Sequence, residues 1–226
     1  MNVTDLRERL EEDLAWRIDE LRHLRNELLG SQETSEWPVS AMRAILVMQY
    51  AHLEGFAQIA FSYYVDAVNA RSLQAHEIKS NLFASACTAE FEALRTGGSG
   101  DQEDDDGRLS RRAKKQVEFV EKLRSISQTV VSIDPEAAVS MEMNFGKDVL
   151  KRTLYRLGIP ESEVSTGYFA SLEFVRRTRN DIAHGSRKER IDPGVFNAHR
   201  AKCESFMGEL IRLITAAIRQ EWFRAT

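Results

Sequence analysis

The stretch QYAHLEGFAQIAFSYYV, residues 49–65, decides the fold class of this chain. Its aromatic and aliphatic side chains recur at steps of three and four residues, which is the period of an α-helix and not that of a strand. The same pattern extends outward from Trp37-Pro38, where a proline suits the first turn of a helix, to about Asn69. Apolar side chains would point to most sides of this helix: Ile45, Leu46, Met48, Tyr50, Leu53, Phe56, Ile59, Ala60 and Tyr63. We therefore expect a long helix at the centre of the molecule, covered by the others.

The rest of the chain shows the same periodicity. Leucine and isoleucine at helical steps predict a first helix from Thr4 to Gly30. Capping residues, glycines and prolines bound the other helices, which we expect at about 77–94, 111–131, 145–157 and 168–183, with a last helix that opens at Asp192-Pro193. No run of alternating residues predicts a strand, and no internal repeat is present. The sequence thus predicts an all-α fold, a helical bundle of about six to seven helices.

One low-complexity stretch, TGGSGDQEDDDG at residues 96–107, interrupts the helices. Glycine, serine and acidic residues cannot bury apolar area, so we expect a flexible acidic loop at the surface. The acids Asp104 to Asp106 fit a solvated linker better than a cation site, which needs ordered oxygen ligands. Neither side of the loop has an obvious self-contained core, and we expect residues 1–226 to form a single domain.

The composition narrows the class of protein. The chain carries 31 Lys and Arg against 35 Asp and Glu, a formal net charge of −4, so binding to nucleic acid would need a local basic patch. The two cysteines, Cys87 and Cys203, form no disulfide framework, which favours the reducing cytoplasm. The charged first residues predict no signal peptide. The most apolar stretch, 41–60, is interrupted by charged and polar residues, which argues against a membrane span.

Motifs for several common chemistries are absent from the sequence. It contains no phosphate-binding G-x-x-x-x-G-K-[ST] loop, no G-x-S-x-G nucleophile elbow and no H-E-x-x-H metal motif. The five histidines show no metal-ligand spacing. We expect neither a metal nor another cofactor.

The stretch FVRRTRNDIAHGSRKER, residues 174–190, holds the candidate site. Its basic residues outnumber its two acids and form a local positive patch in an acidic protein: Arg176, Arg177, Arg179, Arg187, Lys188 and Arg190. Such a patch suits a phosphate backbone, although a solvated helix face has the same composition.

Within this patch, Arg179, Asn180 and His184 add reactive chemistry. The planar fork of arginine matches phosphate oxygens, histidine takes and gives a proton near neutral pH, and asparagine can hold a ring or a phosphate through hydrogen bonds. Asn180 and His184 share one helix face, whereas Arg179 lies about 140° around the helix from His184. Either the long arginine side chain reaches across or the helix ends near His184, and Gly185 favours such an end.

The spacing of this arginine and histidine is not specific by itself. Arg71 and His76 have the same spacing, but serine follows that arginine and the pair lies in an expected helix junction. We take the second pair as a chance match.

The segment RNDIAHG, residues 179–185, with YFASLEFVRRT before it and one long closing helix after it, resembles the HEPN superfamily of all-α ribonucleases. The superfamily signature is an arginine, a polar residue and a histidine near the end of a helix, and asparagine holds the polar position here. LAWRIDELRHLRN, residues 14–26, and the stretch 49–65 resemble the first two helices of its bacterial MAE-type branch. The resemblance covers most of the chain apart from the acidic loop.

This resemblance implies a metal-independent endoribonuclease, often the toxin of a toxin–antitoxin or phage-defence module, whose two motifs face each other across a homodimer. RNA supplies the nucleophile, its 2′-hydroxyl. His184 would act as general base or acid on the 2′-hydroxyl or the leaving 5′-oxygen, Arg179 would stabilise charge on the phosphate, and Asn180 would orient His184 or bind a phosphate oxygen. The residues assigned to RNA binding are Arg176, Arg177, Arg187 and Lys188. The expected partners are RNA, a second copy of the chain and a cognate antitoxin protein.

Two other functions stay open at this stage. One is a non-catalytic HEPN-like module that binds RNA, a nucleotide or a protein partner. The other is a helical interaction protein in which Arg179 and His184 are structural. Glu54, on the central helix, is either a partner of the site or an ordinary polar contact.

Overall fold

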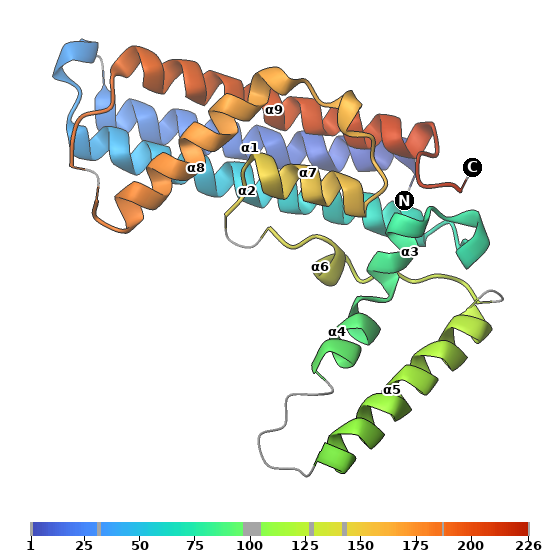
Figure 1. Cartoon of the computed structure of the whole chain (residues 1–226). Helices are drawn as coiled ribbons and strands as arrows, with labels where there is room; N and C mark the ends of the chain where they lie inside the picture. The colour runs from blue at the N-terminus through green and yellow to red at the C-terminus, as the bar shows by residue number, and fades with distance from the viewer. Residues whose placement is uncertain are drawn as a thin grey trace.

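The computed structural model describes residues 2–30, 33–96, 105–126, 129–141, 144–186 and 188–225 (Figure 1). In these residues, turns and loops join the helices, and the extended segments form only two isolated β-bridges. The α-helices are α1 Val3–Leu29, α2 Val39–Asn69, α3 Ser80–Ala86, α4 Thr88–Thr96, α5 Asp105–Ile126, α6 Pro135–Ala138, α7 Lys147–Arg156, α8 Phe169–Ala183 and α9 Pro193–Arg219. The all-α fold class is confirmed, with nine α-helices in the described residues instead of the expected six to seven.

The helix α2 occupies the centre of the bundle. The helices α1, α8 and α9 all pack against it, and Figure 1 shows α1, α2 and α9 side by side with α8 crossing them. Phe56, Phe61 and Tyr64 of α2 are fully buried. Because full burial of a large apolar side chain contributes roughly 1.5–3 kcal/mol, α2 anchors the core.

Local signals fix the ends of the long helices. The Asn2 side chain accepts a hydrogen bond from Asp5 N (2.9 Å) at the start of α1, and the Asp192 side chain accepts one from Val195 N (2.9 Å) at the start of α9. Gly30 has a φ of 57° and follows the last residue of α1. The start of α9 at Asp192-Pro193 and the end of α1 before Gly30 agree with the sequence prediction. The start of α1 differs, because Asn2 and not Thr4 caps this helix.

The helix expected over residues 77–94 is divided in two. The helix α3 ends before Cys87, whose N–H donates to Ala84 O (3.1 Å), and α4 begins at Thr88, whose hydroxyl donates to Ser85 O (2.7 Å). Cys87 is buried at this break. Neither glycine nor proline marks it, so the pattern of the sequence predicts one helix where the structure has two.

The helix expected over residues 111–131 begins and ends earlier, as α5. From residue 129, where the described residues resume, the chain runs beside the turn that follows α2, and Val131 N donates to Leu73 O (2.8 Å). Asp134-Pro135, which the sequence marks as a helix breaker, instead opens the short helix α6 as its cap and first residue.

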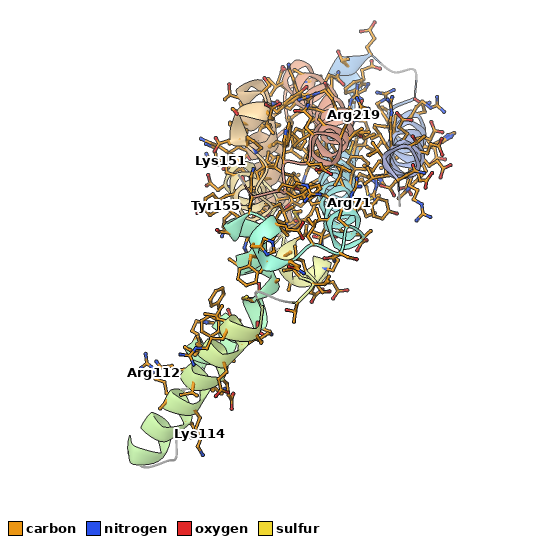
Figure 2. The ribbon with its side chains drawn as sticks, turned by 90° about the vertical axis from the view of Figure 1, so that its right-hand side faces the viewer. Arg71, Arg112, Lys114, Lys151, Tyr155 and Arg219 are labelled. Atoms are coloured by element: carbon orange, nitrogen blue, oxygen red, sulfur yellow. The ribbon has the colours of Figure 1, made fainter. Side chains whose placement is uncertain are left out.

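The predicted acidic loop at 96–107 lies largely outside the described residues. Its ends are helical, because Thr96 closes α4 and residues 105–107 form the first turn of α5. The helices α4 and α5 pack against each other and project from the bundle as an arm, which Figures 1 and 2 show from two directions.

Cys87 and Cys203 are both buried and form no disulfide. In the described part of the chain, none of the helices combines the length and the apolar character needed to cross a membrane.

Candidate active site

The candidate site lies where α8 ends. The N–H groups of Gly185 and Ser186 donate to carbonyl oxygens of the last helical turn, at 3.1 and 2.9 Å. Gly185 has a φ of 70°. A helix end that is closed by two such backbone hydrogen bonds requires this left-handed conformation, which glycine adopts without strain. The helix therefore ends at His184, as Gly185 favours, and the His184 side chain is exposed.

Arg179 is held against the central helix. Its guanidinium carbon lies 4.3 Å from the centre of the Tyr50 ring, and its Nη1 donates to Asn180 Oδ1 (2.8 Å). An arginine over an aromatic face is attracted by the ring quadrupole, by about 0.5–2 kcal/mol. Arg179 is half-buried, so its fork is positioned by the protein before any ligand binds.

Asn180 is occupied on both sides of its amide. Its Oδ1 accepts the bond from Arg179, and its Nδ2 donates to Asn144 Oδ1 (3.1 Å) on the loop before α7. The same oxygen of Asn144 accepts a bond from Arg176 Nη1 (3.0 Å). In this arrangement Asn180 orients Arg179, and its predicted action on His184 or on a phosphate stays a prediction.

Beneath Arg179, Tyr50 and Glu54 form a second layer of the site. The Tyr50 hydroxyl donates to Glu54 Oε1 (2.9 Å), and the same oxygen accepts a bond from Phe145 N (3.1 Å). Burial and the neighbouring Glu54 carboxylate raise the pKa of Tyr50, so its ring stays neutral under the guanidinium. Glu54 is thus a partner of the site and fixes both the Tyr50 ring and the loop that carries Asn144.

Glu173 forms ion pairs with two of the arginines assigned to RNA binding and offsets one of their two charges. Its Oε1 lies 2.6 Å from Arg176 Nη2 and 2.6 Å from Arg177 Nε. The hydrogen bond from Arg176, with that from Arg177, lowers the pKa of Glu173 to about 2. The stability that these bonds contribute is present above the ordinary glutamate pKa and is lost as the pH falls toward about 2. Arg177 is 71% exposed and Arg176 only 21%.

The segment after His184 carries the remaining basic residues of the patch. Lys188 and Arg190 are exposed, and Arg190 Nη2 donates to Thr34 O (2.5 Å) in the turn between α1 and α2. Arg187, which the sequence assigns to RNA binding, lies outside the described residues.

The structure joins some of the predicted site residues and separates others. Arg179 and Asn180 share one network with Tyr50 and Asn144. The His184 side chain has no hydrogen bond or ion pair to the described residues. The imidazole is therefore exposed to solvent, five residues, or about one and a half helical turns, beyond the positioned Arg179.

Sequence reasoning missed Tyr50 and Asn144. Tyr50 lies four residues before Glu54 on the same helix face. A phenol and a carboxylate at this spacing predict a side-chain hydrogen bond, so the sequence does contain a signal for this pair. Asn144 gave none, because it contacts residues 32 and 36 positions away in a loop. Among the described residues, no group of three or more His, Cys, Asp or Glu side chains is arranged to hold a metal ion.

An all-α bundle whose penultimate α-helix carries an arginine, an asparagine and an exposed histidine at its C-terminal end has the arrangement of a HEPN domain. The model of the MAE_28990-like HEPN family matches residues 6–223, and the chain belongs to this family. HEPN domains are generally nucleases or RNA-binding domains. No curated protein and no solved structure matches the chain.

Proposed function

We propose that this protein is a metal-independent endoribonuclease whose motif of Arg179, Asn180 and His184 acts at the interface of a homodimer. The observation that carries the proposal is the pairing of a positioned arginine fork with an exposed imidazole at the end of α8. An electrostatic clamp and a proton-transfer group are the two functions that cleavage of RNA needs from a protein without a metal.

In the proposed reaction, the 2′-oxygen of RNA attacks the adjacent phosphorus and the bond to the 5′-oxygen breaks. One His184 accepts the proton of the 2′-hydroxyl, and a second His184 donates a proton to the leaving 5′-oxygen. Arg179 stabilises the negative charge that grows on the phosphate oxygens. The products are a 2′,3′-cyclic phosphate and a 5′-hydroxyl end.

The homodimer follows from the two proton transfers. Each chain supplies one exposed His184 at the end of α8. The neighbouring Ala183 and Gly185 are small and exposed, so two copies of the helix end can approach each other across a two-fold axis. We place this enzyme in the cytoplasm, as the toxin of a toxin–antitoxin or phage-defence module with a cognate antitoxin protein as its partner.

The second candidate is a non-catalytic HEPN module that binds RNA. The observation that favours this function is the state of the Asn180 amide, which is bonded to Arg179 and Asn144. Asn180 therefore does not orient the His184 ring, which has no partner among the described residues. A histidine that nothing orients is a weaker proton-transfer group than one held by a hydrogen bond.

One assay separates these functions. We expect the protein to cleave labelled RNA in the presence of EDTA and to leave 2′,3′-cyclic phosphate ends. A substrate with 2′-deoxyribose at the cleaved position should stay intact, because it lacks the nucleophile. Retention of RNA without cleavage would identify the binding module, and the absence of both activities would leave a protein interaction role.

Glu173→Gln should strengthen RNA binding. The substitution removes the carboxylate that pairs with Arg176 and Arg177 and frees one positive charge for a phosphate. The slope of log Kd against the logarithm of the salt concentration should become steeper by about one, because about one more counterion is released when RNA binds. Glu209→Gln is the matched control, because Glu209 pairs with Arg212 at similar exposure on α9. An equal gain in both variants would show that overall charge, and not this patch, sets the affinity.

A further inference from the structure

The arm formed by α4 and α5 exposes apolar side chains. Three of them lie on α5: Val117 is 56% exposed, Val120 45% and Leu123 39%. The helix packs mainly against α4, and Figure 2 shows the arm standing away from the bundle. A helix of this length is marginally stable in water unless tertiary contacts cover its apolar side. We therefore expect the exposed apolar face of α5 to be covered by another protein surface.

The face that α4 covers is known from its contacts. The Phe119 ring packs on Phe91 (centroids 5.6 Å apart), Lys122 forms an ion pair with Glu90, and Lys115 Nζ donates to Ala93 O (3.4 Å). At 100° per residue, this face lies on the opposite side of α5 from Val117 and Val120. The apolar face is therefore not a part of the contact with α4.

The opposite face has the spacing of a coiled-coil seam. Ala113, Val117, Val120 and Arg124 follow one another at steps of four, three and four residues, and they line a groove of about 420 Å³ along α5. A second, antiparallel α5 helix would place Val117 opposite Val120 of the other copy, and small Ala113 opposite the long Arg124. The arginine stem can cover apolar surface there while its head reaches water.

Charges beside the seam favour the same antiparallel register. Lys114 and Glu121 flank the seam on one side, seven residues apart. In the antiparallel register that pairs position 117 with position 120, Lys114 of each copy lies beside Glu121 of the other copy. One helix pair therefore contains two such contacts between opposite charges. In a parallel pair the two Lys114 side chains would lie on opposite sides of the seam, and neither would lie beside Glu121 of the other copy. Figure 2 shows Lys114 on the arm, at a distance from the bundle.

We propose that α5 binds the α5 helix of a second copy of this chain in an antiparallel pair, through the seam of Ala113, Val117, Val120 and Arg124. This contact is separate from the one proposed at His184. If the contacts at α5 and at His184 join the same two chains, the result is one dimer. If they join different chains, they link dimers into a larger assembly. The arm thereby sets the size of the assembly, whatever reaction the bundle carries out.

Introduced thiols test the register directly. The single variants Val117→Cys and Val120→Cys of the full chain are mixed and oxidised. We expect a disulfide-linked dimer with the bond between positions 117 and 120, and less linkage in either variant alone. Val130→Cys is the control, because Val130 has the same 56% exposure as Val117 but lies outside α5. The native Cys87 and Cys203 are buried and do not compete.

Charge reversal supplies a second, independent measurement. By sedimentation, Lys114→Glu and Glu121→Lys should each weaken self-association on the order of tenfold, and the double variant should restore it. Preferential linkage of position 117 to itself, equal linkage by Val130→Cys, or failure of the double variant to recover would overturn the proposal. Loss of RNA binding by Lys114→Glu with unchanged mass would make the arm an RNA contact instead. Because cleavage is assayed separately, failure of this contact and failure of the proposed ribonuclease activity give different results.

Discussion

We expect His184→Ala to lose the proposed RNA cleavage, with a melting temperature within about 2 °C of the wild type. The imidazole is exposed and has no hydrogen bond or ion pair to the described residues, so its removal should change stability by less than about 0.5 kcal/mol. A proton-transfer group contributes roughly 10²–10⁴-fold to a reaction rate, and in the proposed homodimer the substitution would remove both copies of His184 at once. Cleavage rates and thermal melts on the same preparations measure the two effects.

His76→Ala is the matched control for this substitution. His76 has the same spacing from an arginine, is also exposed, and lies in the turn before α3. It should keep full activity and full stability. Wild-type cleavage by His184→Ala would refute the catalytic assignment, and equal loss from His76→Ala would mean that the second motif is the active one.

Arg179→Ala should lower the cleavage rate by roughly 10²–10³-fold, the usual effect of removing a group that stabilises charge in a transition state. Unlike His184, Arg179 is half-buried over the Tyr50 ring and bonded to Asn180. Its removal should therefore also cost about 1 kcal/mol of stability. Single-turnover rates and denaturant unfolding curves measure the two effects separately.

Arg179→Lys refines this prediction. Lysine keeps the positive charge but lacks the planar fork that stacks on Tyr50 and bonds to Asn180, so activity should recover only in part. Arg71→Ala is the control, since Arg71 is exposed and Figure 2 shows it on the bundle, apart from the arm. Full activity of Arg179→Ala would exclude an electrostatic role for this arginine.

The helices that carry the site could be predicted from the sequence because their signals are local. The three- and four-residue apolar steps around Phe56 mark α2, and Gly185 marks the end of α8 at His184. The break at Cys87 could not be predicted, since a buried cysteine carries no conformational preference that stops a helix.

The sequence predicts the candidate reactive residues of the site, whose action stays a prediction, but it does not predict the residues that support them. Arg179, Asn180 and His184 lie within six residues, so their pattern is visible in the sequence. Tyr50 and Asn144 join them only through the folded bundle, because their contacts span many positions of the chain. The ion pairs of the arginine patch are also visible only in the structure. Glu173 lies just before Arg176 and Arg177 and pairs with both, which offsets one of their two charges.

The single oxygen of Glu54 that accepts bonds from both Tyr50 and Phe145 bears on the thermodynamics of ligand binding at Arg179. It ties the ring under Arg179 and the loop beside Asn180 to the same point on the central helix. The rotameric freedom of the Arg179 side chain, about 2 kcal/mol for an arginine, is therefore largely surrendered when the protein folds. Little ordering entropy would remain to be lost on binding of the proposed RNA ligand, so Arg179 would meet that ligand in an already fixed conformation.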